Sequence, residues 1–312
     1  MTGATPPGWR AMHARAAVAT ALSGGRTVLP VLRSAPPLTL RQTGPHAVHL
    51  VSTAAGPLGG DRFELDLDVA PGTSLRVGSI ASTLVLPGRG ESLSVVTARV
   101  GEGAALSFAP EPTVLAAGCS HRMVVRLSLA EGARVRWREE IVFGRHGEAP
   151  GRCHARFDAT VEGVPLLRQE FVVGDPALDA SPAVYGPARC VGTTLLAAPP
   201  RRSPSQTVTG ETVTREAVIG EAVTREAVIR EAVTGEAIAT EAVIGEAMIR
   251  EAVTGTAVTG KAVIGKAVVR EGVAVLPLAG PGTLVSALAR DAVELRRLLE
   301  WGEAQVTGGA DR

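Results

Sequence analysis

Aromatic side chains are scarce in this chain: three Trp, one Tyr and five Phe account for 3% of its 312 residues. A surface that binds nucleic acid generally combines a basic stripe with aromatic side chains on which bases stack. The formal net charge is only +1, and the Lys and Arg residues are scattered along the sequence. Neither component of such a surface is visible, so we expect no nucleic-acid partner.

Cysteine is also rare, and long hydrophobic runs are missing. The three cysteines, Cys119, Cys153 and Cys190, are odd in number and far apart, unlike the dense disulfide framework of small secreted proteins. The sequence has no uncharged apolar stretch of about 18 residues, roughly the length that a membrane-spanning helix needs. These absences favour a cytoplasmic protein with no membrane partner.

What the chain does contain is a low-complexity repeat. From residue 207 to 271, a five-residue unit of the form Ala/Thr-Val/Ile-Thr/Ile-Gly/Arg-Glu occurs thirteen times. In a strand, an odd period would place successive Glu residues on opposite faces. In a helix it would spread the valines around all sides, so that no apolar stripe forms. We therefore interpret residues 200–271 as a low-complexity pentapeptide-repeat insert.

The repeat also produces a string that imitates a nucleotide-binding loop. Residues 255–261 read G-x-x-x-x-G-K, as do residues 260–266. A P-loop continues with a Ser or Thr that ligates magnesium, whereas Ala262 and Ala267 follow here. Any period-five segment with Gly and Lys in these positions generates the string, so we expect no nucleotide chemistry from it.

Outside the insert, short alternating segments predict β-strands. Apolar and polar residues alternate over 63–69, 93–100, 123–129 and 135–142, with Gly or Pro-Gly turns between them. Such alternation is typical of half-buried antiparallel strands. The predicted fold is therefore mainly β: an irregular β-solenoid or sandwich of antiparallel strands with a short C-terminal helix, interrupted by the insert.

The segment after the insert predicts one more strand and that helix. Residues 272–278 read as the strand, Gly280-Pro281-Gly282 as a turn, and Thr283 as the N-cap of a helix that continues to Trp301. Both flanks of the insert thus look like parts of one domain. The predicted organisation is a flexible N-terminus (1–15), one β domain (16–199 with 272–301), the insert (200–271) and a flexible C-terminus (302–312).

Soft metal ligands occur in two places, as Cys119 with His121 and as Cys153 with His154. Two sulfurs and two imidazoles could bind zinc or nickel if the fold brought them together. Their spacings are not those of a standard zinc site, and a free cysteine often serves as a small buried hydrophobe. Neither G-x-S-x-G nor H-E-x-x-H is present, so we expect no stably bound metal and no catalytic nucleophile.

A collinear series of motifs carries a family resemblance. Residues 56–83 read GPLGGDRFELDLDVAPGTSLRVGSIAST, residues 106–118 read LSFAPEPTVLAAG, and residues 135–148 read VRWREEIVFGRHGE. PPLTLRQTG precedes them, and RCVGTTLLA and GVAVLPLAGPGTLVSALA follow. This series resembles the urease accessory proteins of the UreD/UreH class and covers nearly everything except the repeat.

The resemblance implies an all-β, solenoid-like fold with two helices and no catalytic activity of its own. Proteins of this class look like scaffolds that bind apo-urease and a UreF-type partner, which recruits the UreG-type GTPase that brings nickel. We therefore expect a cytoplasmic chaperone for nickel insertion, with nickel in transit rather than stably bound. The alternative is a repeat-based β-solenoid binding module with no role in metal delivery.

Oxygen-bearing side chains in these segments are candidates for a transient nickel route, because oxygen ligands suit a passing divalent cation. The candidates are Asp61, Ser82, Thr83, Glu139 and Glu140. Asp61 could equally cap a turn. Adjacent residues of a strand face opposite sides, so at most one of Glu139 and Glu140 should point inward, where it needs a partner such as Arg145 or a water-filled channel.

Five further residues are predicted to be structural. Gly59 and Gly60 permit a tight turn before Asp61, and Arg145, Gly147 and Glu148 form a GR-x-GE turn.

Overall fold

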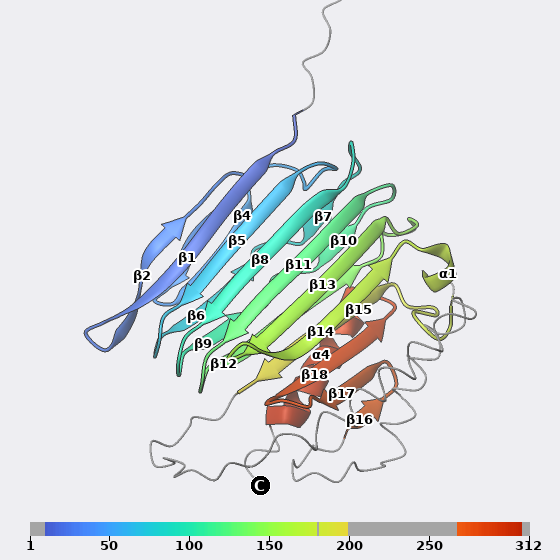
Figure 1. Ribbon diagram of the computed structural model, residues 1–312. Helices are drawn as coiled ribbons and strands as arrows, with labels where there is room; N and C mark the ends of the chain where they lie inside the picture. Colours follow the sequence, from blue (N-terminus) through green and yellow to red (C-terminus); the bar gives the residue numbers. More distant parts are fainter. Residues whose placement is uncertain (1–9, 180, 199–266, 308–312) are drawn as a thin grey trace, which may run out of the picture. The chain divides into compact units, whose positions relative to one another are not determined.

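The computed structural model describes residues 10–179, 181–198 and 267–307 (Figure 1). The chain divides into two compact units, and all described residues belong to the unit formed by the two flanks. The expectations for residues 200–266, including the repeat and its P-loop-like string, lie outside the described residues. Within them the chain is mainly β and solenoid-like with a short C-terminal helix, as the sequence predicts.

The strands form two sheets. Sheet A has seven strands, in the spatial order β14 (Val164–Val173), β13 (Arg152–Val161), β11 (Ser120–Leu129), β8 (Ser92–Val100), β5 (Arg62–Val69), β1 (His13–Ser23) and β2 (Arg26–Arg33). Sheet B has eleven strands, nine of them in the order β16 (Val268–Arg270), β17 (Val273–Pro277), β18 (Gly282–Ala289), β15 (Cys190–Ala197), β12 (Arg134–Val142), β9 (Ala105–Phe108), β6 (Ser74–Ser79), β4 (Ala47–Ser52) and β3 (Leu38–Gly44). The short strands β10 (Thr113–Leu115) and β7 (Thr83–Val85) join sheet B beside β12.

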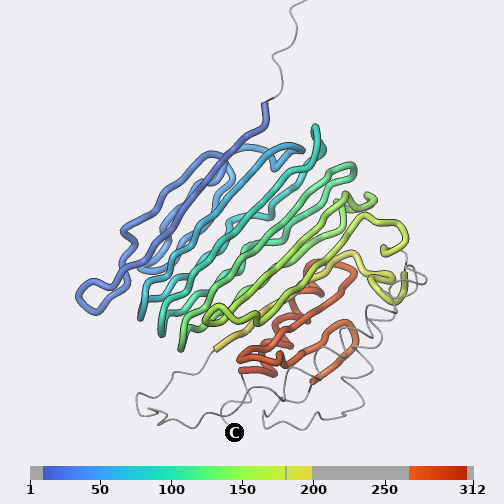
Figure 2. The backbone as a smooth tube through the Cα atoms, viewed as in Figure 1, coloured from blue at the N-terminus to red at the C-terminus, as the bar shows by residue number. Residues whose placement is uncertain are grey.

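The centre of each sheet is parallel, which corrects the prediction of antiparallel strands. From β4 to β13 the chain passes back and forth between the sheets (Figure 2), so neighbours within a sheet are one coil apart, as for Leu65 and Val96. Antiparallel pairs occur at the edges, in β1–β2, β3–β4, β13–β14 and from β12 through β15, β18 and β17 to β16. Alternation reports which face of a strand is buried, whereas the connections decide its direction.

Glycine turns stack at one end of the coils. The N–H of Gly72 donates to the carbonyl of Glu102 (2.9 Å), and the N–H of Gly103 donates to the carbonyl of Glu131 (3.1 Å). Gly72 and Gly103 have φ of 68° and 61°, a backbone region that a Cβ disfavours. The recurring turns APGT, GEGA and AEGA thus hold successive coils in step.

The main core lies between the two sheets. Leu67 and Leu127 of sheet A and Leu75, Leu106 and Trp137 of sheet B belong to one buried cluster. The ring of Trp137 stacks between Phe108 (centroids 4.1 Å apart) and Phe157 (5.8 Å). Most of the few aromatic residues therefore serve the interior rather than a binding surface.

The C-terminal segment differs from its prediction. Residues 282–289 form β18 between β15 and β17, and the helix α4 spans Ala292–Thr307. Its N-cap is Asp291, whose Oδ1 accepts the N–H groups of Val293 (2.9 Å) and Glu294 (2.8 Å). A short apolar run cannot be assigned to strand or helix by periodicity alone, and here pairing with two strands decides it.

The expected ends of the segments also differ in places. The helix α4 runs through residues 302–307, which were predicted to be flexible, and β1 begins at His13, inside the predicted flexible N-terminus. The strand β16 consists of the last residues of the predicted insert. A second helix, α1, is a single turn at Pro176–Asp179.

Candidate functional site

A cavity of about 140 Å³ lies between the sheets, where the strands of sheet A begin and those of sheet B end. Its lining is mostly apolar, with a few ionisable and sulfur-containing side chains. Sheet A contributes Phe63, Leu65, Ser94, Val96, His121 and Met123, while Leu50, Phe108, Thr83, Glu111, Glu139 and Glu140 come from sheet B or its connections.

Glu139 is the ionisable side chain that β12 directs into this space. It alternates with Trp137 and Ile141, which are buried between the sheets, and it takes part in no ion pair within the described part of the chain. Burial raises the pKa of Glu139 to about 7, and the nearby indole of Trp137 only partly opposes this rise. The Trp137 Nε1 has no partner in hydrogen-bond geometry. The carboxylate is thus poised between its neutral and charged forms near neutral pH.

His121 lines the same cavity from β11. It is 2% exposed, and burial lowers its pKa to about 4, with Ser92 and Glu91 offsetting only part of this effect. Ser92 Oγ lies 2.8 Å from His121 Nδ1 and 3.2 Å from the carbonyl oxygen of Ser120. With its lowered pKa the imidazole is neutral at pH 7 and carries a lone pair on one ring nitrogen.

The chemistry of this cavity suits weak and reversible cation binding. Carboxylate and neutral imidazole are both ligands for nickel, and Glu139 and His121 supply one of each. In the part of the chain that the structure describes, no group of three or more His, Cys, Asp or Glu side chains is arranged to hold a metal ion. The other carboxylates that line the cavity, those of Glu64, Glu111 and Glu140, are in ion pairs with arginines, so Glu139 and His121 are two available ligands rather than a closed coordination shell.

Glu140 lies on the opposite face of β12, under α4. Its side chain is 1% exposed and contacts Arg296 (3.4 Å) and Arg138 (3.7 Å). Burial raises the pKa of Glu140, and the two guanidinium groups oppose this rise. The expectation that the two adjacent carboxylates face opposite sides agrees with this geometry, although α4 buries the outer one as well.

Of the other predicted route residues, Asp61 and Ser82 do not line the cavity. Asp61 is buried, with Oδ1 accepting the N–H of Met12 (2.8 Å) and Oδ2 that of Leu58 (2.9 Å). Both oxygens thus tie loops together, as a turn cap does. Thr83 lines the cavity, whereas Ser82 is exposed and does not.

The predicted GR-x-GE turn is formed, but Arg145 is not a partner for an inward carboxylate. Its guanidinium pairs with Glu148, with Nε 2.9 Å from Oε2. Hydrogen bonds from Arg145 lower the pKa of Glu148 to about 2. Gly147 between them has φ of 75°.

The two predicted turn glycines act in different ways. Gly60 has φ of 91° and forms the turn. A Cβ on Gly59 would lie 2.4 Å from the carbonyl oxygen of Gly90, so Gly59 is required by the close approach of another loop.

The four soft ligands are only partly brought together. Cys153 pairs in register with His121, and both side chains are buried, whereas His154 points outward to Glu170 (3.2 Å). Cys119 is buried in the same cluster as Cys153. Three of the four thus lie on the inner side near one another, and the fourth faces solvent.

All three cysteines should resist thiol reagents in the native protein. Burial raises the pKa of Cys119 and Cys190 to about 11 and that of Cys153 to about 12, and the thiolate is the reactive form. We expect no rapid reaction with Ellman's reagent at pH 8, followed by three equivalents on unfolding in guanidinium. Rapid labelling of any one of them in the native state would contradict this assignment.

The sequence singles out His121 only as part of a Cys/His set that could bind zinc or nickel, and it does not single out Met123. The alternation of β11 could have placed both residues on the inner face. His121 and Met123 continue the series of the buried residues Val125, Leu127 and Leu129, which are two positions apart on one face of the strand. No comparable signal marks Glu111, whose carboxylate meets Arg296 from α4 (3.0 Å).

No helix among the described residues has both the length and the apolar character needed to cross a bilayer. The sequence matches the family of the UreD urease accessory protein over residues 12–307. A urease accessory protein UreD from Frankia casuarinae is 42% identical over 228 residues, which cover 62% of this chain and 71% of that protein. Proteins of the same name from Parafrankia sp. (40% over 222 residues; 62% and 74% covered) and Streptomyces avermitilis (41% over 183 residues; 56% and 73%) are also similar. The protein therefore belongs to the UreD family of urease accessory proteins, which confirms the resemblance seen in its sequence.

Proposed function

We propose that this protein is a non-catalytic scaffold of the cytoplasm that supports nickel insertion into urease. In this role it binds apo-urease together with UreF-type and UreG-type accessory proteins. Membership of the UreD family supports a role in urease maturation. The partners and the nickel step belong to the proposal.

The observation that carries the nickel step is Glu139 in the cavity between the sheets. A carboxyl group with a pKa of about 7 loses its proton to solvent when a divalent cation binds and takes up a proton again when the cation leaves. The neutral His121 adds a second ligand on the opposite wall, in sheet A. Nickel is thus cargo, held by few ligands and passed on.

Among the predicted route residues, the proposal keeps Glu139 and Thr83 as direct contacts, since both line the cavity. Glu140 borders the cavity but faces α4 on the outer side of β12, where Arg296 already neutralises its charge. Asp61 supports the route by holding Met12 and Leu58 in place.

Co-expression with the other urease accessory genes tests the proposal. We expect tagged protein to recover a soluble complex with the UreF-type partner and apo-urease. Deletion of residues 207–266, which keeps β16, should leave that complex largely intact, because the two flanks pair directly through β15 and β18. Purified, folded protein that associates with neither partner would refute the scaffold role. Loss of the complex only on deletion would favour the repeat-based binding module.

A further inference from the structure

One part of the outer face of sheet B is left uncovered by the helix. The helix α4 packs on β12, β15, β17 and β18. The strands β3, β4, β6 and β9 contain no Asp or Glu, while Arg41 and Arg76 are exposed on β3 and β6. This face therefore carries positive charge without carboxylates of its own.

The register of these strands builds a trough over β9. The outward residues of β9 are the small Ala105 and Ser107. Ser107 pairs with Arg76 on one side and with Arg136 on the other, and Ala105 pairs with Arg134. A hollow of about 320 Å³ lies here. Small side chains form its floor, and arginines stand along both sides.

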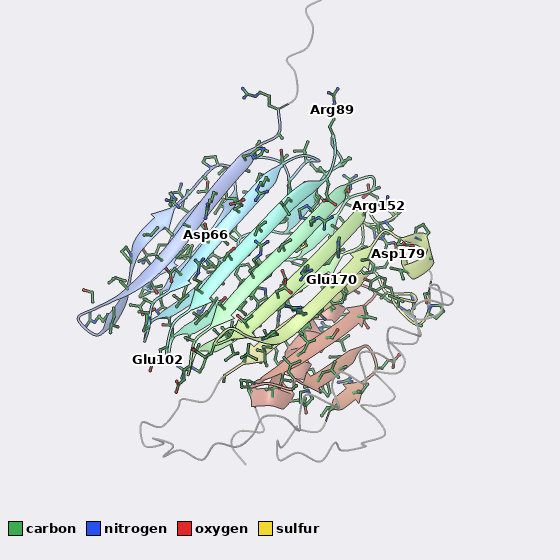
Figure 3. The ribbon with its side chains drawn as sticks, in the orientation of Figure 1. Asp66, Arg89, Glu102, Arg152, Glu170 and Asp179 are labelled. Atoms are coloured by element: carbon green, nitrogen blue, oxygen red, sulfur yellow. The ribbon has the colours of Figure 1, made fainter. Side chains whose placement is uncertain are left out.

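The arginines of the trough contrast with those on the outer face of sheet A. On sheet A, Arg15 lies 2.7 Å from Asp66, and Arg156 contacts both Asp158 (2.7 Å) and Glu170 (3.2 Å). Figure 3 shows Asp66 and Glu170 on that sheet. These acidic and basic residues thus neutralise one another, and two further arginines of that face, Arg99 and Arg126, lie in register beside Asp68 and Asp158.

In the trough, by contrast, most of the positive charge is uncompensated. Among the described residues, no carboxylate lies within 4.0 Å of Arg76 or Arg134. Arg136 shares Glu303 with the buried Arg138. The trough therefore presents more guanidinium groups than carboxylates of the described residues pair with.

We propose that this trough binds an extended, acidic segment of a partner protein. Arg134 and Arg136 are two residues apart on one strand, which is the spacing, about 7 Å, between alternate side chains of an extended peptide. Carboxylates on alternate residues of such a segment can each reach a guanidinium, and Arg76 approaches from the opposite side. No Phe, Tyr or Trp side chain is present among the trough residues, and His46 supplies a single ring, so an array of rings on which successive bases could stack is lacking.

The identity of the partner, a component of the urease maturation complex, rests on the proposed function, whereas binding of an acidic segment does not. Binding of an acidic segment can be tested apart from the nickel route, because a synthetic acidic peptide serves as the probe and no nickel is present. Failure of the peptide to bind leaves the nickel route standing, and failure of nickel insertion leaves the trough standing.

The test uses a labelled peptide of roughly ten residues, alternating Glu and Ala, and its counterpart with Gln for Glu. Fluorescence anisotropy with the full chain should show binding of the Glu peptide that weakens between about 50 and about 300 mM NaCl, as expected for screened charges. The variant R76E/R134E should bind at least about tenfold more weakly. R99E/R126E, on the exposed outer face of sheet A, should bind within about twofold of the wild type.

Several results would overturn the proposal. Equal binding of the Glu and Gln peptides, or an equal loss in both double variants, would remove the trough from the interaction. Tighter binding of single-stranded DNA than of the Glu peptide would identify a nucleic-acid surface instead. Peptide binding that appears only after deletion of residues 207–266 would assign the trough to the chain's own glutamates.

Discussion

Replacing Glu303 with glutamine is expected to lower the free energy of unfolding by about 3–5 kcal/mol, the usual cost of breaking a buried ion pair. Glu303 lies on α4 and accepts hydrogen bonds from Arg136 (2.9 Å), Arg138 (2.6 Å) and Thr194 (2.7 Å). The Arg138 side chain is only 6% exposed. Without the carboxylate, the buried Arg138 would keep only the more distant carboxylates of Glu140 (3.7 Å) and Glu300 (3.8 Å), and α4 would lose a main polar contact with sheet B.

Guanidinium unfolding curves measure this effect, and Glu300→Gln provides the control. Glu300 lies on the same helix, 60% exposed and 3.8 Å from Arg138, so its loss should change stability by less than about 1 kcal/mol. A similar effect of both substitutions would show that helix propensity, rather than the buried pair, is responsible. Less than about 1 kcal/mol for Glu303→Gln would show that Arg138 finds another partner.

The contribution of Glu303 should also depend on pH in a defined direction. Burial works against its charge, but the hydrogen bonds from Thr194, Arg136 and Arg138 together outweigh burial and lower the pKa. A lowered pKa in the folded state means that the stabilisation is present above the ordinary pKa of a glutamate. It is lost as the pH falls through the lowered value. The difference between wild type and Glu303→Gln should therefore shrink in acid.

The strands of this fold were predictable because each one is half buried. Alternation located β5, β8, β11 and β12 to within one to three residues of their bounds. Strand direction was not predictable from alternation, since it depends on whether the next strand lies in the same sheet. The recurrence of APGT, GEGA and AEGA at nearly constant spacing is the signal that could have indicated parallel coils.

The candidate site was predictable in part for the same reason. Opposite orientations for Glu139 and Glu140 follow from the pleat alone. Burial of Glu140 does not, because it depends on α4, which lies more than 150 residues further along the chain and docks through Arg296. Partners of this kind, set by tertiary packing, are absent from any local pattern. The sequence offered Arg145 or a water-filled channel for the inward carboxylate, and Arg145 pairs with Glu148 instead.

Glu139→Gln should make the protein more stable at pH 8 and leave its stability at about pH 4.5 nearly unchanged. A rise in pKa from 4.5 to about 7 corresponds to on the order of 3 kcal/mol of cost for the charged form in the fold. Between pH 4.5 and about 7, Glu139 is protonated in the folded state and ionised in the unfolded state. Wild-type stability therefore falls as the pH rises through this range and becomes constant above about pH 7. Thermal melts across this range measure the difference between variant and wild type. Glu170→Gln, at an exposed carboxylate, should show no comparable difference.

Glu139→Gln should also impair nickel insertion into urease. A gain in stability together with a loss of urease activation would separate the role of Glu139 in the nickel route from its effect on folding. If Glu139 is a ligand of passing nickel, cells that co-express the urease genes with the Gln variant at limiting nickel should contain at least about tenfold less active urease, because an amide is a much weaker nickel ligand than a carboxylate. A variant that is more stable but yields less active urease cannot owe its defect to misfolding. If the variant also still forms the complex with apo-urease, the defect lies in a step after assembly of that complex. Full urease activation by Glu139→Gln would remove this carboxylate from the route and, with it, the observation on which passage through the cavity depends.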